Sequence, residues 1–209
     1  MQNIAVVSDV HLGSVYSKCK DFYYFIENLE TDLLILNGDI YDLYLGPPIS
    51  NIFELIENNP KIKDYKYIRG NHDHNIDTYF PLITFLDEVI LEDIHITHGD
   101  QYDWLVKEES KLSGSTTRLR NKIEKIFKFN VKVWSNKLFG KLINWILFRA
   151  NKEAAKAYPD KRVIIGHTHI PVCNHPHYNS GGFVDDVLSY IEIAIDDDKK
   201  TSINLIQIR

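Results

Sequence analysis

Residues 33–42 read Leu-Leu-Ile-Leu-Asn-Gly-Asp-Ile-Tyr-Asp, an uninterrupted apolar run that ends abruptly in polar residues. A short run of this kind is typical of a strand that is covered on both faces. The same arrangement recurs four more times along the chain. The further runs, each with the polar residues that follow it, are Ile4–Val7 before Ser8-Asp9, Tyr67–Ile68 before Arg69-Gly70-Asn71-His72, Ile94–Thr97 before His98-Gly99, and Val163–Ile165 before Gly166-His167.

Helical stretches are expected between several of these strands, at residues 21–30, 51–58 and 81–88. Alternation of strands and helices predicts an α/β architecture. The end of the chain differs, because residues 187–195 and 202–208 alternate in polarity and flank the polar segment 196–200. This pattern predicts an antiparallel hairpin.

The chain has 209 residues, of which 44% are hydrophobic and 25% charged, so we expect one folded domain over residues 1–209. No apolar run approaches the roughly 18 residues of a membrane-spanning helix. The first residues show no basic region before an apolar one, so no signal peptide is visible. A cytoplasmic location is the resulting expectation.

Residues 103–158 form a distinct segment by charge, with 13 Lys or Arg against 5 Asp or Glu, whereas the remainder has 11 against 24. All three tryptophans lie in it, and from Thr116 onward its apolar residues recur with a helical period. We interpret it as a basic, aromatic-rich helical insertion, which suggests an anionic and partly apolar partner. A solvated helical hairpin packed on the main body explains the pattern equally well.

Metal-binding residue types gather directly after the predicted strands. They are Asp9-x-His11, Gly38-Asp39-x-x-Asp42, Gly70-Asn71-His72-Asp73, His98-Gly99 and Gly166-His167-x-His169. In an α/β sheet, residues beyond the carboxyl ends of parallel strands converge on one edge. Imidazoles, carboxylates and an amide oxygen together suit Mn²⁺, Fe or Zn²⁺ better than Ca²⁺. One such motif alone would equally fit an ordinary buried histidine, but five at strand ends favour a metal site.

This motif set resembles that of the calcineurin-like metallophosphoesterase superfamily over nearly the whole chain. The resemblance implies two mixed β-sheets packed face to face with helices outside, a four-layer sandwich. It also implies two divalent metals, with manganese favoured and iron or zinc as alternatives. Asp9, His11 and His169 would hold the first metal, Asn71, His98 and His167 the second, and Asp39 would bridge both.

The same resemblance implies hydrolysis of a phosphodiester or pyrophosphate by a hydroxide that bridges the metals. His72 matches the family's catalytic histidine, and Asp42 matches the carboxylate that orients it. Asp73 is interpreted as a supporting residue. His74, His95, His175 and His177 lie outside the motifs and are expected in solvated or loop positions, with His177 as a weak substrate-site candidate.

Three stretches resemble the UDP-2,3-diacylglucosamine diphosphatase branch. They are residues 8–13, residues 38–43, and Tyr178-Asn179-Ser180-Gly181 with Val184-Asp185-Asp186. In that branch a helical insertion at the matching place covers two acyl chains, which implies substrate contacts for Arg118, Arg120 and Lys122. One residue departs from the branch, because its best-known enzymes carry Arg where this chain has His72.

His72 therefore leaves a second hypothesis open, a phosphodiesterase or phosphatase of a soluble nucleotide, with nucleic acid as a less favoured partner of the basic segment. A third, from another class, is a metal-stabilised interaction module without turnover. The expected partner is a phosphorylated small molecule or a lipid-linked substrate. Peripheral membrane contact through the insertion is an open alternative, since basic, Trp-bearing helices can lie at a membrane surface.

Overall fold

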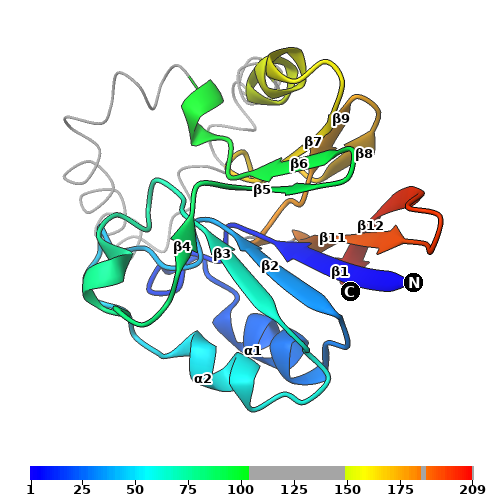
Figure 1. Ribbon diagram of the computed structural model, residues 1–209. Helices are drawn as coiled ribbons and strands as arrows, with labels where there is room; N and C mark the ends of the chain where they lie inside the picture. The colour runs from blue at the N-terminus through cyan, green and yellow to red at the C-terminus, as the bar shows by residue number, and fades with distance from the viewer. Residues whose placement is uncertain (104–148, 185–186, 209) are drawn as a thin grey trace.

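The computed structural model describes residues 1–103, 149–184 and 187–208, and within them the chain forms two β-sheets packed face to face (Figure 1). The first sheet has the strand order β10-β11-β1-β2-β3-β4, and β12 pairs with β11. Its strands are β1 (Gln2–Val7), β2 (Leu33–Asn37), β3 (Tyr65–Ile68), β4 (Phe85–Leu86), β10 (Phe183–Val184), β11 (Val187–Ile195) and β12 (Thr201–Ile208).

The second sheet has the order β5-β6-β7-β9-β8. Its strands are β5 (Glu88–Leu91), β6 (Ile94–Thr97), β7 (Arg162–Ile165), β8 (Val172–Asn174) and β9 (His177–Asn179). Both sheets are mixed: β1, β2, β3 and β4 run parallel, as do β6, β7 and β9, whereas β11 runs antiparallel to β1 and β5 antiparallel to β6.

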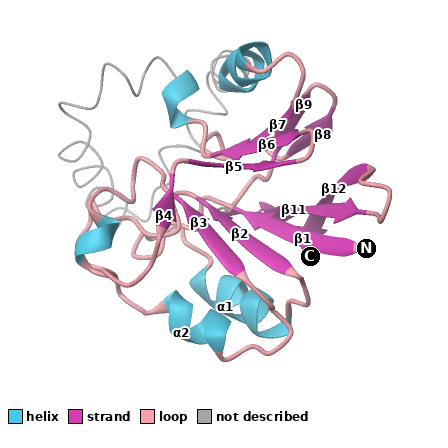
Figure 2. Cartoon of the chain, in the orientation of Figure 1, coloured by secondary structure: helices cyan, strands magenta, loops and turns pink. Residues whose placement is uncertain are grey.

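Strand β1 has apolar contacts on both faces, as its uninterrupted run predicts. Ala5 and Val7 belong to the cluster that includes Phe22 of helix α1 (Cys19–Asn28), whereas Ile4 and Val6 pack in the core between the sheets with residues such as Ile164. Helix α1 and helix α2 (Ile52–Glu57) lie side by side outside the first sheet (Figure 2). Helical residues 149–157 lie outside the second sheet, where Ala150 and Ala154 pack on β7. This arrangement confirms the expected four layers.

Most of the expected elements are confirmed, with one exception. Helices α1 and α2 cover the first two predicted helices, and β11 and β12 form the predicted hairpin. The helix expected at residues 81–88 is wrong, because Phe85 and Leu86 pair with Tyr67 and Ile68 as strand β4 and Glu88 begins β5. Apart from Asp103 and residues 149–158, the predicted insertion lies outside the described residues. In the part of the chain that the structure describes, no helix has the length and apolar character needed to cross a bilayer.

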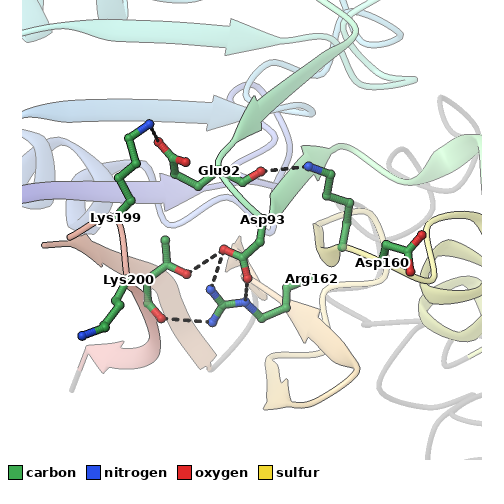
Figure 3. Close-up of a pocket in the computed structure, with 8 residues that line it drawn as sticks. Glu92, Asp93, Asp160, Arg162, Lys199 and Lys200 are labelled. Atoms are coloured by element: carbon green, nitrogen blue, oxygen red, sulfur yellow. Dashed lines mark hydrogen bonds and ion pairs between the residues drawn. The ribbon is translucent and has the colours of Figure 1, made fainter. Parts of the chain in front are cut away.

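Ion pairs join the turns at the end of the sandwich where β6, β7 and β12 begin (Figure 3). The Arg162 guanidinium donates two hydrogen bonds to the Asp93 carboxylate, at 2.8 and 2.9 Å, and one to the carbonyl of Thr201 at 3.2 Å. The Thr201 hydroxyl also donates to Asp93 at 2.7 Å, and Lys199 pairs with Glu92 at 3.1 Å. The network ties the second sheet to the β11–β12 hairpin of the first.

We expect Arg162→Met to lower the free energy of unfolding by about 1 kcal/mol at pH 7, because a bidentate pair that is partly shielded from water exceeds the usual surface ion pair. Urea denaturation measures the change. Lys156→Met is the matched control, since Lys156 makes an exposed pair with Glu153 and should change nothing measurable.

The difference between wild type and Arg162→Met should also depend on pH. Burial opposes the shift, but hydrogen bonds from Thr201 and Arg162 lower the pKa of Asp93 below its ordinary value. The contribution of the pair is therefore present above the unfolded-state pKa of about 3.9 and is lost as the pH falls through the lower folded-state value. An unchanged difference between pH 7 and pH 2.5 would contradict the assignment.

Candidate metal centre

Five of the seven predicted metal ligands have a left-handed backbone conformation. The φ angles are 54° at Asp9, 51° at His11, 55° at Asp39, 60° at His167 and 55° at His169. Non-glycine residues rarely adopt this conformation, and when they do they concentrate at functional sites. The left-handed backbone at these strand ends therefore sets the direction in which the five predicted ligand side chains point.

Hydrogen bonds between the loops after β1 and β2 hold these conformations. Asp9 donates its backbone N–H to the carbonyl of Gly38 at 3.0 Å, and His11 donates to the carbonyl of Asp39 at 2.9 Å. Gly38 has a φ of 81°, and a Cβ at this position would overlap the imidazole of His98. Glycine is therefore required here, where the end of β2 meets the histidine that follows β6.

Each predicted carboxylate ligand has one oxygen engaged by the fold. Oδ2 of Asp9 accepts from the Ser8 hydroxyl and, at 2.9 Å, from the backbone N–H of His167. Oδ1 of Asp39 accepts from the backbone N–H of His72 at 2.7 Å. The other oxygen of each, Oδ1 of Asp9 and Oδ2 of Asp39, faces the histidines.

The imidazoles surround these two oxygens. Nε2 of His169 lies 3.1 Å from Oδ1 of Asp9 and 3.1 Å from Nε2 of His11, while Nε2 of His98 lies 3.2 Å from Oδ2 of Asp39. Three groups of potential ligand atoms result, each within 4.8 Å: Asp9, His11 and His169; His11, Asp39 and His72; and Asp39, His98 and His167. Neighbouring groups share a residue, and Asp39 belongs to two of the three groups.

The donor set fits two divalent cations. Three buried atoms at the site form no hydrogen bond among the described residues, namely Oδ1 of Asp9, Oδ1 of Asn71 and Nε2 of His98, and the first and last lie only at ion-pair distance from His169 and Asp39. Buried polar atoms are ordinarily partnered, and all three are good metal ligands. Nδ1 of His98 donates to the carbonyl of Asn37 at 2.9 Å, so in the neutral imidazole the lone pair lies on Nε2. The mixture of imidazole nitrogen and oxygen suits Mn²⁺, Fe or Zn²⁺.

Opposite charges control ionisation at the site. Burial favours the neutral carboxyl groups, yet the charge of His169 lowers the pKa of Asp9 well below its usual range, and those of His98 and His72 lower the pKa of Asp39. Burial would likewise lower the pKa of His98, but Asp39 raises it well above the usual value. Protons and divalent cations therefore compete for the same ligand atoms.

His72 and Asp42 form a pair next to these groups. Nδ1 of His72 lies 3.1 Å from Oδ1 of Asp42, and the ring centroids of His72 and His11 are 4.6 Å apart. Because a carboxylate only accepts, Nδ1 carries the proton of this bond and Nε2 is left for another partner. Burial opposes the shift, but the charge of Asp39 and the bond to Asp42 raise the pKa of His72.

Asp73 supports the loops rather than facing the histidines. Its fully buried carboxylate accepts backbone N–H groups of Asp39 at 2.6 Å, Tyr41 at 3.1 Å and Gly70 at 3.1 Å. Burial and the charge of Asp39 raise the pKa of Asp73 to about 7. The supporting role expected for Asp73 agrees with these contacts.

Three supporting residues have no role predicted from the sequence. The Ser8 hydroxyl fixes Asp9, and Asn179, one of the residues of the branch resemblance, donates to the carbonyl of Gly166 at 2.6 Å and to Thr168 at 3.0 Å. Asp103, expected only as the start of the insertion, lies 3.1 Å from His167. No sequence signal distinguishes Asp103 from the chain's other acidic residues.

Other predicted residues lie elsewhere or outside the described chain. Arg118, Arg120 and Lys122 fall outside the described residues. The expectation of a solvated or loop position is wrong for His95, which is buried in β6. The ring centroids of His95 and Tyr158 are 3.9 Å apart, and Nε2 of His95 lies 2.8 Å from the Glu88 carboxylate. His74 and His175 are exposed as expected, and His177 is half-buried in β9.

A comparison with protein families now identifies the fold's relatives. Residues 2–171 match the family model described as calcineurin-like phosphoesterase. The chain belongs to this family. The architecture of calcineurin-like phosphoesterases, two packed mixed sheets with outer helices, is the one observed here.

Solved structures with a similar fold include two Vps29 proteins. A single mutant of Vps29 from Entamoeba histolytica is 11% identical, with 99% of each chain covered and a TM-score of 0.48. Vps29 from Chaetomium thermophilum is 12% identical, with 100% of this chain and 94% of that chain covered and a TM-score of 0.44. These values are too low to carry a functional assignment. No curated protein gives a significant match.

We expect Mn²⁺ to raise the melting temperature of the wild-type chain and Asp39→Asn to abolish most of that rise. One site at 100 times its Kd adds about 2.7 kcal/mol of stability, and Asp39 faces two of the three ligand groups. Differential scanning fluorimetry with Mn²⁺ and after EDTA measures the shift. Asp87→Asn, which removes an exposed carboxylate, is the control and should keep the full rise. Equal shifts in both variants would contradict the assignment.

Proposed function

We propose that this chain is a dimetal phosphoesterase that hydrolyses a phosphodiester or pyrophosphate bond. The observation that carries the proposal is the His72–Asp42 pair, at 3.1 Å, beside linked groups of metal-ligand atoms. A metal site that only stabilised the fold would have no need of a partly buried histidine–carboxylate pair next to it. Family membership supports the same class of reaction.

In this proposal Asp39 would contribute a ligand to both cations. Asp9, His11 and His169 provide the first set of ligands, and Asn71, His98 and His167 the second. When bound, a pair of divalent cations offsets the charge on the phosphoryl oxygens and lowers the pKa of a coordinated water. Mn²⁺ is the favoured ion, with Fe or Zn²⁺ as alternatives.

His72 acts on the leaving group. Asp42 takes the Nδ1–H hydrogen bond and fixes the orientation of the ring, which leaves Nε2 to face the substrate. A protonated His72 would donate from Nε2 to the oxygen that departs from phosphorus, or hydrogen-bond the transferring phosphoryl group. The raised pKa of His72 is consistent with this role.

For the substrate we propose a lipid-linked sugar nucleotide, UDP-2,3-diacylglucosamine. Besides the branch motifs, four exposed apolar side chains support it: Val15, Ile49, Tyr79 and Leu82. They lie in the loops that follow the parallel strands β1, β2 and β3, the strands whose carboxyl ends carry the metal-ligand residues. Exposed apolar residues suit a substrate with apolar chains. Arg118, Arg120 and Lys122 are the proposed phosphate contacts of the insertion, and peripheral membrane contact would follow.

A soluble nucleotide diester is the second candidate. The observation in its favour is His72, where the best-known enzymes of the lipid branch carry Arg. A nucleic acid would belong to this alternative through the basic segment 103–158.

We expect His72→Ala to bind Mn²⁺ as wild type does but to lose turnover by on the order of 100-fold, because the proposal makes His72 an acid and assigns it to neither metal. Hydrolysis of bis-p-nitrophenyl phosphate measures turnover, and the Mn²⁺-induced rise in melting temperature measures binding. His175→Ala, an exposed histidine, is the control. If His72→Ala loses metal as Asp39→Asn does, the assignment of His72 is wrong.

The substrate is tested with UDP-2,3-diacylglucosamine, bis-p-nitrophenyl phosphate and p-nitrophenyl phosphate, each with Mn²⁺ and after chelation. We expect Mn²⁺-dependent cleavage of the lipid nucleotide far above that of the aryl esters. The double variant Ile49→Gln/Leu82→Gln should raise KM for the lipid by roughly tenfold through lost apolar contact and leave the aryl diester unchanged.

Ile90→Gln, at an exposed apolar position on β5, is the matched control for the loop variants. Cleavage of the aryl diester alone would favour the soluble candidate. Bound Mn²⁺ without turnover on any substrate would contradict the proposed activity and favour an interaction module.

A further inference from the structure

The Asp103 carboxylate contacts one of the proposed metal ligands from outside the motif set. Its Oδ2 lies 3.1 Å from Nε2 of His167, and both side chains are about nine-tenths buried, with 10% of each exposed. Asp103 directly follows the short 3-10 helix η2 (Asp100–Tyr102), which begins after Gly99. The contact therefore joins the loop after β6 to the loop after β7.

The loop holds Asp103 firmly in this position. Its backbone N–H donates to the carbonyl of Asp100 at 3.0 Å, and Gln101 donates to the hydroxyl of Thr97 at 2.8 Å. The backbone N–H of Gly166, next to His167, donates to the carbonyl of His98 at 2.9 Å. Both partners of the contact are thus anchored to the same pair of strand ends.

The chemistry of the contact determines which nitrogen of His167 can bind a cation. An ionised carboxylate only accepts hydrogen bonds, so Nε2 of His167 must carry the hydrogen of this bond. In a neutral imidazole the lone pair then lies on Nδ1. His98 shows the same logic with the atoms exchanged, because its Nδ1 donates to the carbonyl of Asn37 and its Nε2 faces Oδ2 of Asp39 at 3.2 Å.

We propose that Asp103 is a positioning residue, which fixes the ring orientation and the Nε2–H tautomer of His167 so that Nδ1 is presented to the second metal. The inference rests on the proposed dimetal function for its consequence, but not for the tautomer itself. A carboxylate behind a ligating histidine also makes the imidazole more basic and a stronger ligand, and loss of such a partner typically weakens metal binding 10- to 100-fold. Because Asp103 is also the first residue of the predicted insertion, the insertion would begin at a residue that acts on the metal centre.

The first experiment tests the tautomer in the metal-free protein. Two-bond ¹H–¹⁵N correlation spectra, with His167 assigned through His167→Ala, distinguish Nε2–H from Nδ1–H. We expect Nε2–H in wild type and in Asp103→Asn, whose amide oxygen still accepts, and a mixture of tautomers in Asp103→Ala. An Nδ1–H tautomer in wild type, or an unchanged spectrum in Asp103→Ala, would overturn the proposal whatever the protein's activity.

The second experiment measures Mn²⁺ binding by isothermal titration. We expect two sites in wild type and in the control Asp87→Asn, one of them weakened roughly 10- to 100-fold in Asp103→Ala and less than about tenfold in Asp103→Asn. His167→Ala should weaken the same site, and the double variant should lose no more than His167→Ala alone. Two unchanged sites in Asp103→Ala, or additive losses in the double variant, would overturn the proposal. A wild-type chain that bound no Mn²⁺ would instead overturn the dimetal function, while the tautomer result would stand.

Discussion

Four buried aspartates at one end of the sandwich impose the constraint on which the rest of the site depends. Asp9, Asp39, Asp42 and Asp73 are each at most 3% exposed. Ionised carboxylates buried this closely are unfavourable unless positive charge or strong hydrogen-bond donors accompany them. Asp73 shows the effect, since burial and the charge of Asp39 raise its pKa to about 7 despite three backbone N–H donors. Histidine protons offset part of this charge, and two divalent cations would offset more of it.

The two packed sheets explain how residues so distant in sequence meet. In the first sheet, β1, β2 and β3 are parallel neighbours, so their carboxyl ends bring Asp9, Asp39 and His72 to one edge. In the second sheet, β6 and β7 are parallel and bring His98 and His167 to the facing edge. Contacts across the gap, such as His98 with the carbonyl of Asn37, join the two halves. A change in packing between the sheets would therefore alter both ligand sets at once.

Strong local patterns predict most of this structure. Uninterrupted apolar runs followed by Asp, Asn or His identify the strands and the candidate ligand residues, because burial on both faces and a polar strand end leave a clear signature. The helix prediction for residues 81–88 fails because the apolar residues Leu82, Ile83, Phe85 and Leu86 fit the period of a helix as well as that of a strand. Parallel pairing with β3 makes Phe85 and Leu86 strand β4. The burial of His95 cannot be predicted locally, because it depends on Tyr158, 63 positions away in the chain.

Asp103 marks the limit of such reasoning. A motif shows which residue types recur at a spacing, but not which carboxylate the fold brings behind a given imidazole. The centre itself is generic: the same ligands can serve diesters, monoesters or pyrophosphates, because two cations recognise phosphoryl oxygen whatever is attached to it. Under the proposed function, selectivity would come from what surrounds the centre, namely the exposed apolar side chains in the loops after β1 to β3, His72, and the insertion that begins at Asp103. Under the proposed function, the Asp103–His167 hydrogen bond would couple the insertion, proposed to contact the substrate, to the residues proposed to hold the second metal.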